Sequence, residues 1–334
     1  MSESAAAREA ADLIASCEVW DATLPWLEEY WDFHTLRRFH SAGFDFVSAT
    51  IQDLPPTFGG VSDGIRRFLA LAKAHESWLT FASTTREVVL AHRDGKLAVG
   101  FNVQNTAQLG GDLSRIQMLR ELGVRHMLLA YQTRNDVAAG CADTADAGLT
   151  PFGRDVVREM NRVGIVVDCS HTGHRSSLEA MEISNRPTIF SHSNAYAVCP
   201  HIRNLRDDQI RLCAAMGGVI GIVGIGSFLG DAQASTGSVF RHLDYIVSLV
   251  GPDHVGLGTD FVRDMAGVWK DIDAQKQTEW PDPTGTQLYE GGCFQPEQLL
   301  ELVTMMMTHG YPREAIQAIL GGNFARVYGA SEGA

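Results

Sequence analysis

The chain has 334 residues, 45% of them hydrophobic, and a formal net charge of −13 at pH 7. This length and apolar content suffice for one large domain with a sizeable core, and α/β barrels commonly reach this size as one domain. The acidic balance argues against nucleic acid and anionic membrane surfaces as main partners, and it favours a small-molecule ligand.

The six cysteines are scattered along the chain and form no Cys-x-x-Cys pair, so we expect buried, reduced thiols. The first residues read as a charged helix former without an apolar secretory core, and no run reaches the length of a membrane-spanning helix. These features predict a cytoplasmic protein that does not insert into a membrane.

Eight short apolar segments, most of them rich in Val, Ile or Leu, predict strands that are buried on both faces. They are Glu18–Asp21, Phe44–Ile51, Leu97–Val103, Val124–Ala130, Gly164–Cys169, Pro187–Ser191, Gly218–Val223 and His254–Thr259. Helical periodicity lies between them, most clearly in Asp112–Leu122, Phe152–Val163, Ser176–Ser184, Asp207–Met216 and Val239–Val250. Asp112 is a candidate N-cap, and Gly123 and Gly164 are candidate helix stops.

Eight strands that alternate with helices predict a (β/α)₈ TIM barrel formed by residues 1–334 as a single domain. The alternative is a doubly wound open sheet, which would need a Gly-rich phosphate turn after its first strand, and Asp21-Ala-Thr-Leu-Pro25 is not one. We expect an N-terminal helix over residues 1–16, a lid or contact loop over 263–293, and closing helices over 296–328.

Two histidines follow neighbouring predicted strands, His171 in Asp168-Cys-Ser-His171 and His192 in Ser191-His192-Ser193. A single histidine at such a place is more often structural. Because adjacent barrel strands lie about 5 Å apart, two imidazoles at neighbouring carboxyl ends can share one ion. The pair therefore predicts a site for a first-row divalent metal ion, most simply Zn²⁺.

Asp260 ends the eighth predicted strand in Gly256-Leu-Gly-Thr-Asp260. A carboxylate there could bind the metal ion or act as general base for an attacking water molecule. The alternative is an aspartate that caps a helix N-terminus.

The loop after the sixth predicted strand carries Arg203 and Asn204. A planar guanidinium group is suited to hold a substrate carboxylate, although a solvated arginine that pairs with Asp207 or Asp208 is the alternative. His201 in the same loop is expected on the surface. Tyr131 after the fourth predicted strand could donate its hydroxyl to a substrate, or it could fill the top of the barrel.

With these motifs the chain resembles the membrane (renal) dipeptidase family, which is peptidase family M19 of the amidohydrolase superfamily. The resemblance runs from about Val19 to about Tyr328 and rests on the motifs Gly148-Leu-Thr-Pro-Phe-Gly-Arg154, Glu159-Met-Asn-Arg-Val-Gly164, Asp168-Cys-Ser-His171, Phe190-Ser-His-Ser193, Arg203-Asn204, Gly217-Gly-Val219 and Asp253-His-Val-Gly-Leu-Gly-Thr-Asp-Phe261. It implies a metal-dependent barrel, commonly dimeric, whose active members hydrolyse dipeptides at a two-zinc site.

Carried over residue by residue, the resemblance implies zinc ligation by His171 and His192. It implies that Asp260 binds the other zinc and handles a proton, and that Arg203 holds the terminal carboxylate of the substrate. The family's bridging glutamate falls on Gln104, and its substrate-contacting histidine falls on or near Tyr131.

The family's His-x-Asp pair falls on Thr23-Leu24-Pro25. A neutral Gln104 amide cannot bridge two cations as a carboxylate does, so we expect the first metal position to be empty or weak. The second position could hold one zinc through His171 and His192, with Gln104 or water completing the coordination.

Three functions follow. One is a scaffold or partner-binding protein whose lid loop makes the contact, but the intact Arg203 and the paired histidines favour a working pocket, which the other two functions use. The first is a dipeptidase-like metallohydrolase that acts on dipeptides or related small amides at a degenerate site with at most one well-held zinc. The second is a repurposed member of the family, such as an isomerase, an enzyme of a biosynthetic pathway or a protein that binds a small carboxylate. A homodimer is expected in either case.

Overall fold

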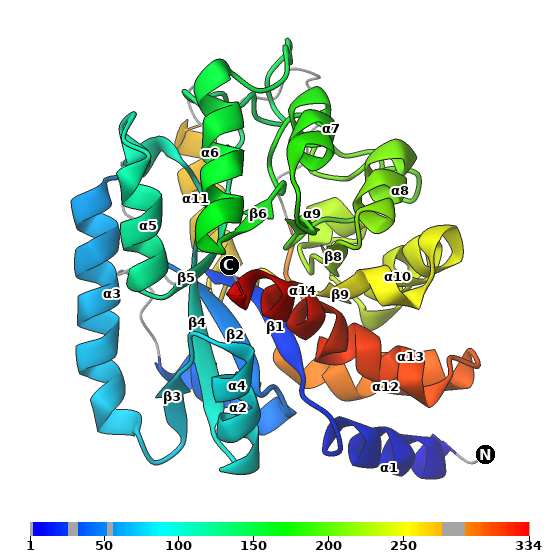
Figure 1. The fold of residues 1–334 in the computed structure, drawn as a ribbon. Helices are drawn as coiled ribbons and strands as arrows, with labels where there is room; N and C mark the ends of the chain where they lie inside the picture. The colour runs from blue at the N-terminus through cyan, green and yellow to red at the C-terminus, as the bar shows by residue number, and fades with distance from the viewer. Residues whose placement is uncertain (1–2, 26–32, 52–55, 276–290, 334) are drawn as a thin grey trace.

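The computed structural model describes residues 3–25, 33–51, 56–275 and 291–333. Nine strands form one parallel sheet in this part of the chain, and eight of them follow the order β1-β2-β4-β5-β6-β7-β8-β9 (Figure 1). Their bounds are β1 Trp20–Pro25, β2 Phe46–Thr50, β3 Leu79–Phe81, β4 Leu97–Val103, β5 Val124–Leu128, β6 Val166–Asp168, β7 Ile189–Phe190, β8 Val219–Ile222 and β9 Val255–Leu257. The predicted (β/α)₈ barrel is confirmed.

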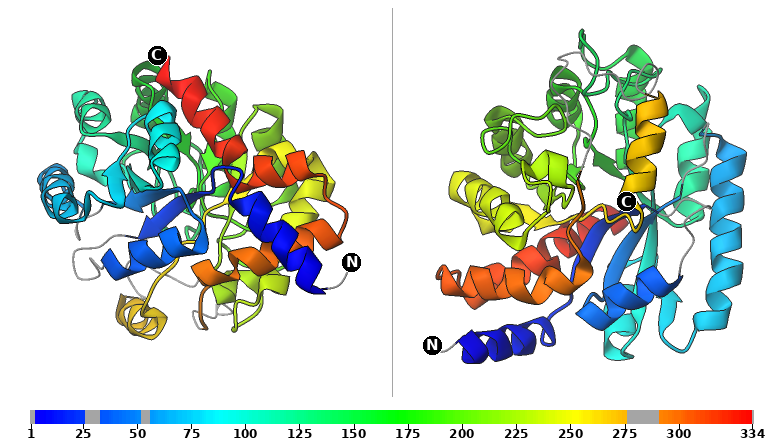
Figure 2. Two further views of the ribbon diagram at one scale, coloured as in Figure 1. Left: turned by 90° about the horizontal axis from the view of Figure 1, so that it is seen from below. Right: turned by 180° about the vertical axis from the view of Figure 1, so that it is seen from behind.

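Helices surround this sheet, as the two views in Figure 2 show. Within the described residues they are α1 Glu3–Ile14, α2 Phe33–Ala42, α3 Phe58–Ala72, α4 Thr85–Arg93, α5 Ser114–Glu121, α6 Pro151–Val163, α7 His174–Ile183, α8 Asp207–Ala215, α9 Gly226–Leu229, α10 Thr236–Val250, α11 Met265–Gln275, α12 Leu299–Thr308, α13 Arg313–Gln317 and α14 Asn323–Glu332. None of these helices has the combination of length and apolarity that crossing a membrane requires. Residues 276–290, about half of the expected lid, lie outside the described part.

Helix α6 shows how local sequence sets the boundaries of an element. The Thr150 side chain accepts a hydrogen bond from the Gly153 amide at 2.9 Å, and Pro151 occupies the first turn. Gly164 ends the helix in the left-handed conformation, with φ +81°, which glycine adopts without steric cost. The chain then enters β6 directly, so this stop determines where the segment that carries His171 begins.

The ends of the barrel differ. The first residues of several strands pack with Phe324, Val327 and Tyr328 of α14 into a small apolar cluster. Helix α14 therefore closes the amino-terminal end, and the carboxyl ends of the strands remain for a site, as in other barrels of this kind. Helix α1 lies against α12, which brings the first helix of the chain beside its last part (Figures 1 and 2).

A buried carboxylate joins the first barrel strand to the last. Asp21 is fully buried and accepts hydrogen bonds from the amides of Thr23 at 3.0 Å and Thr259 at 3.1 Å, and from the Thr259 hydroxyl. One backbone bond, from the amide of Asp260 to the carbonyl of Thr23 at 3.1 Å, crosses the same seam. Burial raises the pKa of the Asp21 carboxyl to about 6.

The structure extends β1 beyond the predicted end at Asp21, because the pairing of β1 with β2 shifts register between Asp21 and Leu24 and then resumes. It also adds β3, which pairs only with β4 beside the barrel path. The sequence around Asp21 to Leu24 gives no sign of the register shift, and the three residues of β3 are too few to form a distinct apolar pattern.

Replacing Asp21 with Ala should lower the free energy of unfolding by roughly 2–4 kcal/mol, because three buried donors lose their acceptor. Urea denaturation at pH 7 measures the loss. The exposed Asp63, which pairs on the surface with Arg66, provides the control: Asp63→Ala should stay within about 0.5 kcal/mol of the wild type. Equal effects for the two variants would contradict a special role for Asp21.

Asp21 should also make stability depend on pH. Because its folded-state pKa of about 6 lies above the unfolded value, the folded state retains a proton that the unfolded state releases. This contribution is complete below about pH 4 and is lost as the pH rises through about 6. The unfolding free energy of the wild type minus that of Asp21→Asn should therefore fall by about 2–3 kcal/mol from pH 4 to pH 7. A difference that rises with pH would contradict this assignment.

Candidate functional site

The predicted site residues follow the carboxyl ends of five barrel strands. Gln104 follows β4, Tyr131 follows β5, His171 follows β6, His192 follows β7 and Asp260 follows β9. Since all of these strands are parallel, the five residues lie at one rim of the barrel.

His171 and His192 point their imidazole rings at one another. Their Nε2 atoms lie 2.9 Å apart and share a hydrogen bond, and both side chains are almost fully buried. Two nitrogen ligands of one tetrahedral zinc lie about 3.3 Å apart, given zinc–nitrogen distances of about 2.0–2.1 Å. The observed separation is therefore close to the one that a shared ion requires.

The Nδ1 atom of each of these two rings also has a hydrogen-bond partner. The Nδ1–H of His171 donates to Gln132 Oε1 at 2.7 Å, which leaves a lone pair on His171 Nε2. His192 Nδ1 lies 2.6 Å from Ser191 Oγ and 3.3 Å from Thr23 Oγ1. A hydroxyl both donates and accepts hydrogen bonds, so these two can bind His192 Nδ1 whether or not it carries the proton. The His192 proton can therefore move from Nε2 to Nδ1, which would free Nε2 for a metal ion.

Burial keeps both imidazoles neutral. It lowers the pKa of His171 and of His192 well below the usual histidine value, and the positive charge of Arg203 adds to the effect on each ring. Neutral imidazole is the form that binds zinc, so the electrostatics suit a metal ligand.

Arg203 is buried beside the two histidines, with 2% of its surface exposed. One of its terminal amino groups donates to the carbonyl of His192 at 3.0 Å, and its Nε–H has no hydrogen-bond acceptor among the described residues. The alternative of a solvated arginine is wrong. A buried guanidinium group with an unused donor is suited to receive an anionic group of a ligand.

The neighbours of Arg203 hold the loop. The Asn204 amide donates to the carbonyls of Cys199 at 2.9 Å and Phe228 at 2.8 Å, so its two donors are used within the protein. His201 is 5% exposed, its Nδ1 accepts from the Arg203 amide, and its ring packs on Phe228. The expectation that His201 lies on the surface is wrong, because the loop folds inward to place Arg203.

Asp260 is half-buried and adopts a left-handed backbone conformation with φ +54°. Burial raises the pKa of its carboxyl to about 7; nearby Arg203 lowers the value and Asp21 raises it. Helix α11 begins five residues later at Met265, so Asp260 does not cap that helix. A carboxyl that titrates near neutrality at the barrel rim is suited to proton transfer.

Tyr131 stacks on His171, with ring centroids 4.3 Å apart and an interplanar angle of 21°. Gln132, which sequence reasoning missed, follows it with φ +58° and a fully buried side chain. Its oxygen also accepts from the Cys141 thiol at 3.1 Å. The only signal for Gln132 was its place after a strand end, and a glutamine gives no hint of a left-handed conformation.

Gln104 and Thr23 occupy positions where the family resemblance implies ligands of a first metal ion. Gln104 donates from its amide nitrogen to Thr50 Oγ1 at 3.2 Å, and no hydrogen bond joins it to either histidine. Thr23 contributes a hydroxyl beside His192. Within the described residues no group of three or more His, Cys, Asp or Glu side chains could hold a metal ion. His171 and His192 are therefore the described side chains that the expected zinc would bind, with its remaining ligands supplied by other donors.

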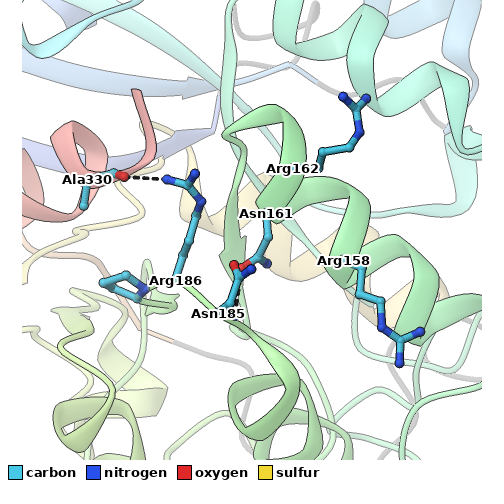
Figure 3. A pocket seen from close by; sticks show the side chains of 7 residues that line it. Arg158, Asn161, Arg162, Asn185, Arg186 and Ala330 are labelled. Carbon is cyan, nitrogen blue, oxygen red and sulfur yellow. Dashed lines mark hydrogen bonds between the residues drawn. The ribbon is translucent and has the colours of Figure 1, made fainter. Parts of the chain in front are cut away.

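A cavity of about 220 Å³ opens beside this rim, and its lining includes His171, Arg203, Cys141 and Tyr196. A larger recess of about 490 Å³ lies between the end of α6 and the end of α14 (Figure 3). Its arginines Arg158, Arg162 and Arg186 point in different directions, and the first two pair with Asp155 and Glu159. Of these two, the smaller cavity is the one that reaches His171 and Arg203.

The family model for membrane dipeptidases, peptidase family M19, matches residues 46–278, which is more than half of the chain. The chain belongs to the membrane dipeptidase family. Two fungal relatives are dipeptidase tcpJ of Claviceps purpurea, 30% identical over 75% of the chain and 54% of the relative, and dipeptidase aclJ of Aspergillus oryzae, 31% identical over 71% and 52%. The chain spans about half the length of these curated relatives.

Solved structures share the fold. An amidohydrolase from Pseudomonas aeruginosa aligns with a TM-score of 0.87 at 25% identity, over 97% of this chain and 99% of that one. A metallo peptidase from Rhodobacter sphaeroides, liganded with a phosphinate mimic of the dipeptide L-Ala-D-Ala, aligns with a TM-score of 0.76 at 22% identity, over 94% and 99%. The family resemblance inferred from the motifs is confirmed.

Metal analysis tests the fit described above. We expect about one zinc ion per wild-type chain purified without chelator. The double variant His171→Ala, His192→Ala should contain almost none, because it lacks the two imidazoles that meet at the rim. Elemental analysis gives the content. The matched control is His92→Ala, His254→Ala, whose imidazoles pair with Asp45 and with the Gly218 carbonyl away from the rim. Two zinc ions per wild-type chain would show that the rim holds a second zinc ion despite Gln104 and Thr23.

Proposed function

We propose that this protein is a dipeptidase-like hydrolase of dipeptides or related small amides, with a degenerate centre that holds at most one zinc ion. The observation that carries the proposal is the pair of buried, neutral imidazoles 2.9 Å apart beside a buried guanidinium group. Membership of the membrane dipeptidase family supports the reaction class.

In this proposal His171 and His192 hold the zinc ion, with Gln104, Asp260 or water as further ligands. The bound ion would act as a Lewis acid on the scissile carbonyl. Gln132 and Ser191 keep the imidazoles in place through their Nδ1 atoms.

Arg203 binds the carboxylate of the substrate. Its buried side chain retains an unused Nε–H donor, and a guanidinium group forms paired hydrogen bonds with a carboxylate. Asp260 accepts the proton of the attacking water and returns it to the leaving amine, which requires a carboxyl with a pKa near neutrality. Tyr131 borders the substrate where it stacks on His171, and Asn204 acts by holding the loop.

A second candidate is a family member with altered, non-hydrolytic chemistry or a protein that binds a small carboxylate. Gln104, Thr23 and Pro25 stand where the resemblance places metal-binding side chains, and this replacement favours the second candidate. The buried Arg203 suits both candidates, because each has a ligand with a carboxylate. As a family member the protein is further proposed to work as a homodimer.

Hydrolysis of L-Ala-L-Ala, L-Ala-D-Ala and their C-terminal amides tests the proposal. The wild type should prefer the free carboxylates, and Arg203→Met should lose about 100-fold in kcat/KM on them, because two charge-assisted hydrogen bonds are removed. The variant should no longer distinguish carboxylate from amide. Arg313→Met serves as control. Arg313 begins α13 and donates an exposed hydrogen bond to the Ser16 hydroxyl after α1, so this variant should behave like the wild type.

Absence of turnover by zinc-loaded wild-type protein on all four substrates would overturn hydrolysis and favour the second candidate. In that case calorimetric titration with a small carboxylate still reports whether Arg203 binds an anion. Tight binding that Arg203→Met abolishes would identify the chain as a carboxylate-binding member of the family.

A further inference from the structure

The two candidate zinc ligands follow the shortest ladder between neighbouring described strands of the sheet. Strand β7 has two residues, and β6 and β7, both fully described, pair at a single position, Asp168 with Ile189. By contrast, β2 and β4 pair at five positions. Backbone pairing alone therefore fixes the relative position of the segments that carry His171 and His192 less firmly than elsewhere in the sheet.

The side chain of Asp168 connects the same two segments. Its Oδ1 accepts hydrogen bonds from the amide of Ser170 at 2.9 Å and from the amide of Ser191 at 3.1 Å. Each of these donors directly precedes one of the histidines. The Ser170 hydroxyl adds a third link by accepting from the amide of His192 at 3.2 Å.

The other oxygen of Asp168 faces a buried histidine. Its Oδ2 lies 3.5 Å from Nε2 of His126 on β5, which is an ion-pair distance, and among the described residues neither atom makes a hydrogen bond. On its far side, His126 Nδ1 lies 2.5 Å from the hydroxyl of Tyr328 on α14. All three side chains are buried.

The chemistry of these groups favours one tautomer of His126. When the neutral ring carries its proton on Nε2, that N–H faces the Asp168 carboxylate and Nδ1 accepts from the Tyr328 hydroxyl. Burial lowers the pKa of His126 to about 4, consistent with a neutral ring in this role. Polar contacts thus lead from Tyr328 on α14 through His126 to Asp168, whose carboxylate binds the backbone beside the two candidate zinc ligands.

We propose that Asp168 is a positioning residue that sets the separation of His171 and His192, and that His126 and Tyr328 hold its carboxylate in place from the base of the barrel. The inference rests on the proposed function in taking the two histidines as the zinc ligands. Groups that orient metal ligands typically change metal affinity when they are replaced, even though they do not touch the ion.

Zinc affinity, measured by competition with a chromogenic chelator, tests the proposal. We expect Asp168→Ala to lower the affinity by about 10- to 100-fold. Asp168→Asn keeps an oxygen acceptor for both amides but turns an amide N–H toward His126, so it should lower the affinity less than Asp168→Ala does, by about three- to tenfold. Tyr328→Phe removes the donor to His126 and should lower the affinity by about three- to tenfold.

Asp45 provides a matched control. It also accepts a backbone amide, that of Val19 at 2.9 Å, and pairs with a histidine, His92, at 2.7 Å, but it precedes β2 away from the carboxyl-end rim. Asp45→Ala should destabilise the fold while leaving zinc affinity unchanged. Wild-type affinity in Asp168→Ala, or equal weakening in Asp45→Ala, would overturn the positioning role.

A second measurement separates this inference from the proposed function. In metal-free protein with ¹⁵N-labelled histidines, the ring resonances of His171 and His192, assigned by their loss in the His→Ala variants, report the shared hydrogen bond. They should shift in Asp168→Ala and Tyr328→Phe but not in Asp45→Ala. If the wild type binds no zinc and these shifts still occur, the proposed function fails and the positioning role stands; unchanged resonances overturn the positioning role. Should Asp168→Ala fail to fold, Asp168→Asn and Tyr328→Phe decide the outcome by the same shifts.

Discussion

Closure of the barrel depends on one buried carboxylate. Among the described strands β1 and β9 form no ladder, and the Asp21 side chain, with one backbone bond beside it, joins them. The same seam carries Thr23 and Asp260, so the groups that close the barrel also place two residues of its rim. A parallel barrel can keep such a charge inside because each of its oxygens has donors to bind.

Buried polar groups organise the rest of the rim in the same way. Asp168 connects the ends of β6 and β7, Gln132 orients one imidazole, and the loop that carries Arg203 folds inward on the side chains of Asn204 and His201. The site is therefore a set of strand ends joined by side-chain hydrogen bonds where the backbone ladders stop. Its geometry depends on residues that do not themselves face a ligand.

The order of strands and the place of both histidines after neighbouring strands could be predicted from sequence, because buried strands have a strong apolar pattern and polar residues after them are conspicuous. The sequence left open whether Arg203 is buried or solvated. Gln132 and the interior contacts of His126 and Tyr328 could not. These residues meet across 39 to 202 positions of chain, and only the closed barrel brings them together. The interruption of β1 was also hidden, since it depends on the side chain of Asp21 and not on a turn motif.

Three residues of the rim that are not glycine, Gln132, His171 and Asp260, have left-handed backbone conformations. Each costs about 1–2 kcal/mol relative to an ordinary conformation, and glycine would relieve that cost at the loss of the side chain. Selection for stability alone would therefore remove the very groups that define the site. The rest of the barrel must offset the free energy of this strain. Substitutions that stabilise distant helices would therefore let the chain tolerate further destabilising replacements at the rim.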